Sequence, residues 1–245
     1  MVIGVTEGGD AGIDFSWEGK IGKVDGAVII TKEITDAFIE KVLRYRDKVI
    51  LHVTCTGFGG TVLEPYVPAA ETQLRQLKKL EHAGFPKKQA VLRIDPVIPT
   101  KKGLLRAQRV VDLSRGLTGR YRVSVLDMYP HVRERFRKAG LPLPYGERFH
   151  AGTEQFRLVD GWLERQESVF ECCAEPHLKN AEQCGCVSER DLSLLGLKLD
   201  KDYPGGFQRR ECLCLGCKRE LLKSKGRCKH NCLYCFWKDE DPGHP

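Results

Sequence analysis

Val49-Ile-Leu-His-Val-Thr54 is a nearly continuous apolar run, and the turn-rich loop Thr56-Gly-Phe-Gly-Gly60 follows it. Such a run, bounded by a turn signal, is typical of a strand that is buried on both faces of a sheet. A helical pattern then begins at about Ala69, stops at Gly84 and aligns Leu74, Leu77 and Leu80 on one face. The stretch therefore predicts a strand–loop–helix unit, the repeating unit of a parallel α/β sheet.

The same alternation extends from this unit in both directions. Further strands are expected at Val2–Val5, Ala27–Thr31, Ala90–Ile94, Arg122–Leu126 and Val169–Cys172, with Asp95-Pro96 halting the fourth strand. Helices are expected after the capping residue Thr35 and over Leu104–Leu113, Val132–Ala139 and Glu154–Glu164. The alternation predicts an α/β fold, a partial or complete (β/α) barrel of about six parallel strands with right-handed crossovers. An open doubly wound sheet is the rival architecture.

The cysteines set the last third of the chain apart. Of the 11 cysteines, ten lie between Cys172 and Cys235, and the other is Cys55. No apolar run approaches the roughly 18 residues of a membrane span, and no signal peptide is visible, so we expect a cytoplasmic protein, or a viral one acting in host cytoplasm. Clustered thiols in a reducing compartment are better explained as metal ligands than as disulfides. We therefore divide the chain into a barrel domain at 1–172 and a Cys-rich, iron–sulfur cluster-binding segment at 173–245.

Polar residues stand where the predicted strands end. They are Thr6, Glu7 and Asp10, then Thr54 and Thr56, then Arg93 and Asp95, and finally Asp127. Reactive groups of parallel α/β proteins gather at the carboxyl ends of the strands. Singly, each residue is more simply a helix cap or a turn residue, but their recurrence at strand ends favours a common site.

The strongest chemical signal is Cys228-Lys-His-Asn-Cys232-Leu-Tyr-Cys235, called the terminal box below. Three thiolates at this spacing can ligate three irons of a [4Fe–4S] cluster and leave the fourth iron without a protein ligand. The alternative is a Cys3His zinc site completed by His230. However, His230 lies two residues from both Cys228 and Cys232, which is cramped for joint ligation. Iron–sulfur is therefore favoured over zinc at this position.

Seven further thiols precede the terminal box, more than one four-ligand site needs. They are Cys172, Cys173, Cys184, Cys186, Cys212, Cys214 and Cys217. An auxiliary [4Fe–4S] cluster and a structural zinc each take four ligands, so the sequence leaves both open and favours the cluster. Neighbouring residues of an extended chain point to opposite sides, so only one of Cys172 and Cys173 is expected to bind metal.

These motifs resemble those of known proteins. The cysteine spacing of the terminal box, with the aromatic Tyr234 before its last cysteine, is the signature of the radical S-adenosylmethionine superfamily. More closely, the chain resembles a family of radical-SAM-like proteins of unassigned function whose box lies at the C-terminus. The matching stretches are Thr56-Gly-Phe-Gly, Leu63-Glu-Pro-Tyr-Val-Pro68, Arg93-Ile-Asp-Pro-Val-Ile98, Leu126-Asp-Met-Tyr129, Cys173-Ala-Glu175, Cys186, Gln208-Arg209, Cys212-Leu-Cys214 and Cys235-Phe-Trp237.

The resemblance implies a circularly permuted TIM-type barrel with two [4Fe–4S] clusters. The catalytic cluster would be held by Cys228, Cys232 and Cys235, and the auxiliary cluster by Cys173, Cys186, Cys212 and Cys214. The implied cofactor is S-adenosyl-L-methionine, which the open iron chelates. One electron, supplied through the cluster by an external donor, then cleaves the cofactor to a 5′-deoxyadenosyl radical.

The remaining site residues are expected to surround that cofactor. Beside the three cysteines of the terminal box, Asp95 and Asp127 are the expected catalytic residues. The expected cofactor-binding residues are Glu7, Gly8, Gly9, Asp10, Thr54, Glu64, Arg93 and Tyr234. Glu7-Gly8-Gly9 replaces an Arg-Arg pair of the family and resembles the Gly-Gly-Glu element that supports the amino group of S-adenosylmethionine, with the acid on the opposite side.

Positive charge is concentrated in the basic band, defined as Lys101–Lys138. The band holds 11 Lys and Arg against 3 Asp and Glu, a net of +8, whereas the whole chain carries +7. Nucleic acid is the usual partner of such a band, although solvated helix faces explain it equally well. By analogy with radical enzymes of viral DNA hypermodification, we expect hydrogen abstraction or an isomerase- or transferase-type rearrangement on a modified base in DNA.

Two alternatives remain open at this stage. One is a radical enzyme that acts on a small molecule or peptide. The other is a zinc-stabilised nucleic-acid-binding module without catalysis. Neither alternative involves a membrane.

Overall fold

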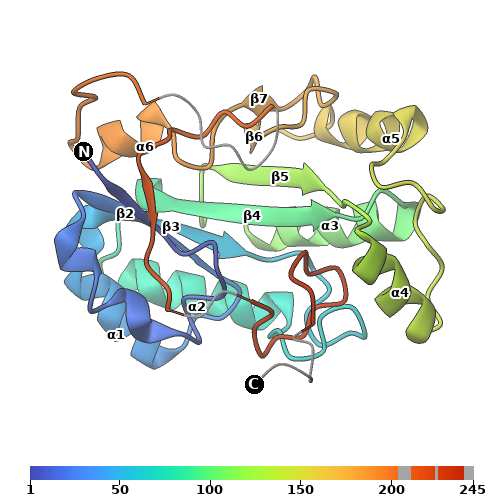
Figure 1. Ribbon diagram of the computed structural model, residues 1–245, viewed down its shortest axis with the longest axis horizontal. Coiled ribbons are helices and arrows are strands. Elements are labelled where there is room, and N and C mark those ends of the chain that lie inside the picture. Colours follow the sequence, from blue (N-terminus) through green and yellow to red (C-terminus); the bar gives the residue numbers. More distant parts are fainter. Residues whose placement is uncertain (204–210, 224–225, 240–245) are drawn as a thin grey trace.

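A parallel sheet forms the frame of the molecule (Figure 1). The computed structural model describes residues 1–203, 211–223 and 226–239. Within them the sheet has eight strands in the order β7-β6-β5-β4-β3-β2-β1-β8, and every neighbouring pair is parallel. The strands are β1 (Ile3–Val5), β2 (Gly26–Thr31), β3 (Val49–Thr54), β4 (Ala90–Val97), β5 (Tyr121–Val125), β6 (Phe170–Cys172), β7 (Glu182–Gln183) and β8 (Lys218–Glu220).

Helices cover one face of this sheet. They are α1 (Asp36–Arg44), α2 (Ala70–His82), α3 (Lys101–Leu113), α4 (Pro130–Lys138) and α5 (Thr153–Leu163). The Cys-rich segment adds α6 (Glu189–Leu194). Buried side chains of α1, α2, α3 and α5 share one core with alternate strand residues, among them Phe38, Leu77, Val110 and Trp162 with Leu51, Leu92 and Val123. Among the described residues, no helix combines the length and the hydrophobicity needed to cross a bilayer.

The strand order confirms the predicted fold class and argues against the doubly wound rival. From β1 to β7 each strand adds to the same edge of its predecessor, so the order never reverses. Right-handed crossovers that all move in one direction place their helices on one face, as in a barrel wall, whereas a doubly wound sheet needs a reversal point. With β7 and β8 at its two edges, the sheet is a partial barrel.

Two predicted boundaries are wrong. Strand β4 does not stop at Asp95-Pro96 but continues to Val97, with a register shift between Ile94 and Val97. Proline is tolerated there because an irregularity in the ladder removes the need for its missing N–H. Helix α3 begins at Lys101 and not at Leu104, because Thr100 caps it by accepting a hydrogen bond from the N–H of Gly103.

The Cys-rich segment contributes more regular structure than its sequence pattern predicts. It supplies β7 at one edge of the sheet and β8 at the other, beyond the six strands expected. Leu192 of α6, with Val187 and Cys217, packs on Val28, Ile50 and Val91, on the sheet face opposite the helices. This segment therefore shares a core with the barrel, and the boundary at 172/173 stays a prediction.

Alternation along the central strands separates an apolar face from a polar one. On β5, Tyr121, Val123 and Val125 join the core beneath the helices. The intervening Arg122 and Ser124 lie on the other face, as do polar residues of the neighbouring strands, namely His52, Thr54, Arg93, Asp95 and Glu171. The inside of the barrel is thus lined with hydrogen-bonding and charged groups toward the carboxyl ends of its strands.

Candidate functional site

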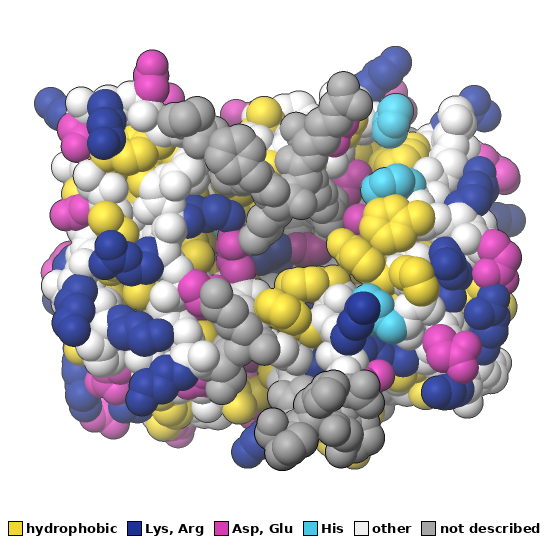
Figure 2. All heavy atoms as spheres, in the orientation of Figure 1, with side chains coloured by type: hydrophobic (Ala, Val, Ile, Leu, Met, Phe, Trp, Pro, Cys, Tyr) yellow, Lys and Arg dark blue, Asp and Glu magenta, His cyan; other side chains and the backbone are white. Residues whose placement is uncertain are grey.

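A cavity of about 770 Å³ opens at the carboxyl ends of the strands, beneath the terminal box. Figure 2 shows a hollow near the middle of the viewed face, with charged side chains of both signs inside it and hydrophobic side chains beside it. Its volume is within the range of small-molecule and cofactor sites. Thirteen predicted site residues line it: Glu7, Gly8, Gly9, Asp10, Thr54, Arg93, Asp95, Asp127, Cys186, Cys228, Cys232, Tyr234 and Cys235.

Tight turns fold the terminal box over the cavity. The N–H of Asn231 donates to the carbonyl of Cys228, and the N–H of Cys235 to that of Cys232, both at 3.2 Å. Asn231 has a φ of 53°, a left-handed conformation that asparagine adopts more readily than most residues. Burial raises the pKa of the Cys228 thiol to about 11 and that of Cys232 to about 12. Because a coordinating cation deprotonates a thiol, metal binding here would release protons.

A buried carboxylate, Glu64, anchors the terminal box to the barrel. Tyr234 donates its hydroxyl hydrogen to Glu64, and Thr56 donates to the same carboxylate at 2.8 Å. Lys32 Nζ lies 2.8 Å from Glu64 and 2.9 Å from the Tyr234 hydroxyl oxygen. Burial lowers the pKa of Lys32, but the charge and hydrogen bond of Glu64, together with the charges of Cys232 and Asp95, outweigh it and hold that pKa above its usual value. Glu64, predicted to bind cofactor, thus fixes the terminal box to the barrel and is not among the residues that line the cavity.

Asp10 and His230 form a second anchor. His230 is 1% exposed, with Nε2 at 3.1 Å from Asp10 Oδ2 and Nδ1 at 3.1 Å from the Tyr66 carbonyl oxygen. Asp10 also accepts hydrogen bonds from the N–H groups of Gly12 and Lys32. His230 therefore orients the terminal box through protein contacts. Asp10 lines the cavity while tying the loop after β1 to the box.

Charged residues from β4 and β5 form the floor of the cavity. Arg93 pairs with Asp95, which also accepts a hydrogen bond from Ser124. Burial alone would raise the pKa of Asp95, but Arg93 and Ser124 outweigh it, so the carboxylate stays ionised. Asp127, at the end of β5, lies 2.9 Å from Nδ1 of the exposed His150. The floor thus offers the Asp95 carboxylate, the carboxyl group of Asp127 and a guanidinium to a bound molecule.

A second cysteine group lies beside this cavity. The sulfur atoms of Cys173, Cys212 and Cys214 lie within 4.8 Å of one another, and the Cys173–Cys214 pair is 3.8 Å apart. Cys186 lines the cavity and donates its backbone N–H to Cys214 Sγ at 3.1 Å. Hydrogen bonds, first from Cys173 and then from Cys186, lower the pKa of Cys214 to about 3. The structure therefore brings three of the four predicted auxiliary ligands together, with Cys186 adjacent.

The spacing of this group fits a metal site. A tetrahedral centre with metal–sulfur bonds of about 2.3 Å separates neighbouring sulfurs by about 3.8 Å. The remaining thiols of the segment lie apart from the group. Cys172 is fully buried in the helix-side core, Cys217 packs on the opposite face of the sheet, and Cys184 contacts Arg122.

Among the cavity residues that sequence reasoning missed are three charged residues and a serine. Lys32 and Ser124 line the cavity, as do Lys218 and Glu220 of β8. Lys218 Nζ lies 3.0 Å from both carboxylate oxygens of Glu7, and Glu220 accepts a hydrogen bond from the N–H of Gly8 at 2.8 Å. The strand-end rule that selected Thr54 would also have found Lys32, which directly follows β2. The three-residue strand β8 is too short to show a periodic pattern, so the sequence carries no comparable signal for Lys218 and Glu220.

Much of the basic band is engaged within the protein. Arg120 and Arg122 are buried in ion pairs inside the barrel. Exposed or partly exposed members pair with neighbouring carboxylates, namely Arg109 with Glu71, Arg115 with Asp112, Arg133 with Glu147, Arg137 with Glu147 and Lys138 with Glu134. In the described part of the chain, Lys101, Lys102 and Arg106 form no ion pair. They lie on the first turns of α3, which follows the carboxyl end of β4 and hence the edge where the cavity opens.

The fold and the site together define a parallel α/β protein with a Cys-rich C-terminal segment and a three-cysteine group suited to metal. The chain belongs to the family described as domain of unknown function DUF1848, whose model matches residues 16–237. No curated protein and no solved structure gave a match. Membership agrees with the resemblance to a family of unassigned function over most of the chain.

Proposed function

We propose that this protein is a radical S-adenosylmethionine enzyme whose active site is the cavity beneath the terminal box. The observation that carries the proposal is that Cys228, Cys232 and Cys235 line the same cavity as the polar strand ends of β1, β3, β4 and β5. Three thiols and a cavity of cofactor size are what a cluster with one open iron and a chelated cofactor require. The bound cluster and S-adenosylmethionine would supply a 5′-deoxyadenosyl radical, with the electron taken from an external donor.

In this proposal the protein's own residues hold the cluster and orient the cofactor and the substrate. The three thiolates hold the cluster, and Glu64, Lys32 and Tyr234 keep their loop fixed against the barrel. Cofactor contacts come from the loop after β1 and from Thr54 and Arg93. Asp95 and Asp127, on the floor and at the rim, are placed to bind the substrate or to accept a proton from it.

The auxiliary [4Fe–4S] cluster belongs to the same proposal, with Cys173, Cys186, Cys212 and Cys214 as its ligands. A second candidate function, a zinc-stabilised module without catalysis, is favoured by one observation. The 3.8 Å between the sulfurs of Cys173 and Cys214 equals the edge of a tetrahedral zinc–thiolate site. The two candidates differ in the metal that the protein retains.

The proposed substrate is a modified base in nucleic acid. Lys101, Lys102 and Arg106 support it, because they present unneutralised charge beside the edge where the cavity opens. Because the other cations of the basic band form ion pairs within the protein, these three side chains would contact about three phosphates. A small molecule or peptide is the alternative substrate, since the cavity alone would hold one.

The test is anaerobic reconstitution followed by measurement of iron, sulfide and zinc per chain. Two clusters predict about eight irons and eight sulfides, and loss of about half of each in a Cys228→Ala variant. Stoichiometric zinc without sulfide would overturn the radical-enzyme proposal and leave the zinc module. A Cys55→Ala variant is the matched control, because Cys55 is buried in the core beneath the helices and should leave metal content unchanged.

A further inference from the structure

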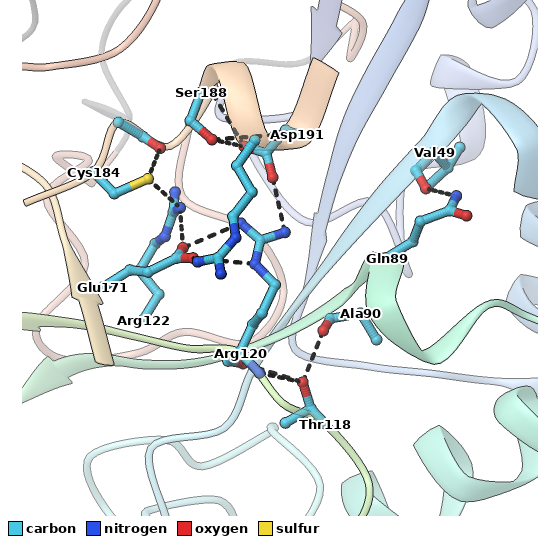
Figure 3. Close-up of polar contacts among 12 residues, drawn as sticks. Val49, Gln89, Ala90, Thr118, Arg120, Arg122, Glu171, Cys184, Ser188 and Asp191 are labelled. Atoms are coloured by element: carbon cyan, nitrogen blue, oxygen red, sulfur yellow. Dashed lines mark hydrogen bonds and ion pairs between the residues drawn. The ribbon is translucent and has the colours of Figure 1, made fainter. Parts of the chain in front are cut away.

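Buried arginines stand behind the second cysteine group, on the polar face of the barrel. Arg122 of β5 is 2% exposed and lies between Glu171 of β6 and Cys184 (Figure 3). Its Nη2 donates to Glu171 Oε2 at 2.5 Å and contacts Cys184 Sγ at 3.7 Å. One edge of this guanidinium is therefore fixed by protein contacts.

Among the described residues, the other two nitrogens of the same guanidinium have no such contacts. Arg122 Nε and Nη1 are buried and find no hydrogen-bond partner among the described residues, and the same is true of Arg93 Nε. Buried donors are almost always paired, because an unpaired one costs about 1–3 kcal/mol. Two unpaired donors on a single charged side chain point to an acceptor that the described residues do not provide.

Sulfur atoms are candidates for that acceptor, because Nη2 of the same guanidinium already contacts Cys184 Sγ at 3.7 Å, two residues before Cys186. Residues Arg93, Arg122 and Glu171 are register partners on adjacent strands. Cys173 follows the end of β6, two residues beyond Glu171. Burial lowers the pKa of Arg122, but the charge of Cys186 is the largest effect that raises it, followed by that of Glu171. The guanidinium thus lies beside the chain that carries Cys184 and Cys186, the latter a member of the predicted ligand set.

We propose that Arg122 is a positioning residue for a metal centre on Cys173, Cys186, Cys212 and Cys214, and that its Nε and Nη1 donate hydrogen bonds to metal-bound sulfur. This inference rests on the second metal centre of the proposed function. Four thiolates leave a net charge of −2 on either Zn²⁺ or a [4Fe–4S]²⁺ cluster, so donors from a cation stabilise the loaded centre in both cases. For a cluster they also raise its reduction potential, since hydrogen bonds to the sulfurs help to set it.

Arg120 provides a matched control on the same strand. It is 7% exposed and donates to the same carboxylate, to Glu171 Oε1 at 3.1 Å and Oε2 at 3.2 Å. It also forms an ion pair with Asp191 at 2.9 Å (Figure 3). The largest effects on its pKa are burial, which lowers it, and the charge of Asp191 with the hydrogen bond and charge of Glu171, which raise it. Loss of Arg120 therefore disturbs the shared ion-pair network without removing a donor to sulfur.

The experiment uses the full chain with Cys228, Cys232 and Cys235 replaced by alanine, so that bound metal belongs to the second cysteine group. Arg122→Met and Arg120→Met are compared in this background by competition with a chelator after anaerobic loading. Arg122→Met should weaken metal retention about 10- to 100-fold, the usual effect of losing a hydrogen bond to a metal ligand, and Arg120→Met should not. Arg122→Lys and Arg120→Lys repeat the comparison if a methionine variant fails to fold.

The outcomes separate this inference from the proposed function. Equal metal retention in the parent and in Arg122→Met, or equal weakening in both arginine variants, would overturn the role of Arg122 and leave the centre in place. Absence of any metal in the parent would overturn the second centre and the inference with it. The cluster on the terminal box would then be judged by its own test, the formation of 5′-deoxyadenosine by the unaltered chain.

Discussion

Replacing Arg135 by methionine is expected to loosen the terminal box while leaving the barrel intact. Arg135 lies on α4, its side chain is 7% exposed, and its guanidinium holds the chain that follows the box. Nη1 donates to the carbonyl of Cys235 at 2.7 Å, and Nη2 to that of Trp237 at 2.6 Å. Methionine keeps the aliphatic packing of the side chain and removes the donors.

The size of the effect follows from these contacts. Each hydrogen bond from a charged donor contributes about 1.5 kcal/mol at the low end of the usual range, so the two together contribute about 3 kcal/mol. The ion pair with Asp239 is left out of the sum, because that carboxylate is 57% exposed and solvent screens it. A loss of about 3 kcal/mol in local opening free energy corresponds to roughly 150-fold faster amide exchange in the segment.

Amide hydrogen exchange measures this opening directly. The reporters are the N–H groups of Leu233, bonded to the carbonyl of Leu63, and of Cys235, bonded to that of Cys232. Amides of β4 serve as the internal reference, and Arg137→Met is the control because Arg137 is half-exposed and bonds Glu147 instead. Unchanged exchange at Leu233 and Cys235, or equal acceleration in the Arg137 variant, would refute the reasoning.

Three further predictions concern the interior and the surface. Burial raises the pKa of Glu171, but Arg122 and Arg120 outweigh burial and hold that pKa below its ordinary value of 4.5. The ionised Glu171 therefore stabilises the folded protein above pH 4.5, and this stabilisation is lost as the pH falls through the pKa of the folded state. Glu171→Gln should lower the free energy of unfolding by about 3–5 kcal/mol at pH 7. It should also reduce the loss of that free energy at acid pH, as measured by urea titrations; an unchanged dependence on pH would count against the ion pairs. His52→Leu should raise the free energy of unfolding by about 1–3 kcal/mol, because both ring nitrogens are buried without a hydrogen-bond partner among the described residues; destabilisation would mean that an unseen partner satisfies them. If Lys101, Lys102 and Arg106 contact duplex DNA, the binding constant should fall about 40-fold between 50 and 200 mM salt, as three phosphate contacts imply. Lys101→Glu should make the binding constant less dependent on salt, whereas salt-independent binding by the parent would favour a small substrate.

The sequence was sufficient for the architecture because the helix and strand periods are distinct along the barrel. Buried runs such as Val49–Thr54 alternate with amphipathic helices such as α2, and the sequential sheet follows from that alternation. The short edge strands β7 and β8 were missed because two or three residues carry no period. Their place in the sheet depends on pairing with β6 and β1, which are distant in sequence.

The candidate site was predictable where a local rule applied. Strand ends and cysteine spacing selected many of the residues that line the cavity. The rules could not tell a lining residue from an anchor. Glu64 lies behind the box because Tyr234, Lys32 and Thr56 surround its carboxylate, and only tertiary packing determines that arrangement.

The central claim is that the terminal box holds a cluster that cleaves S-adenosylmethionine. Its most direct test is to incubate the anaerobically reconstituted, reduced protein with S-adenosylmethionine and to measure 5′-deoxyadenosine. We predict that the parent chain forms 5′-deoxyadenosine and that Cys228→Ala, Cys232→Ala and Cys235→Ala each abolish it without unfolding the barrel. Formation at the parent rate in any one of these variants, or none in a parent chain with a full complement of iron and sulfide, would contradict the claim.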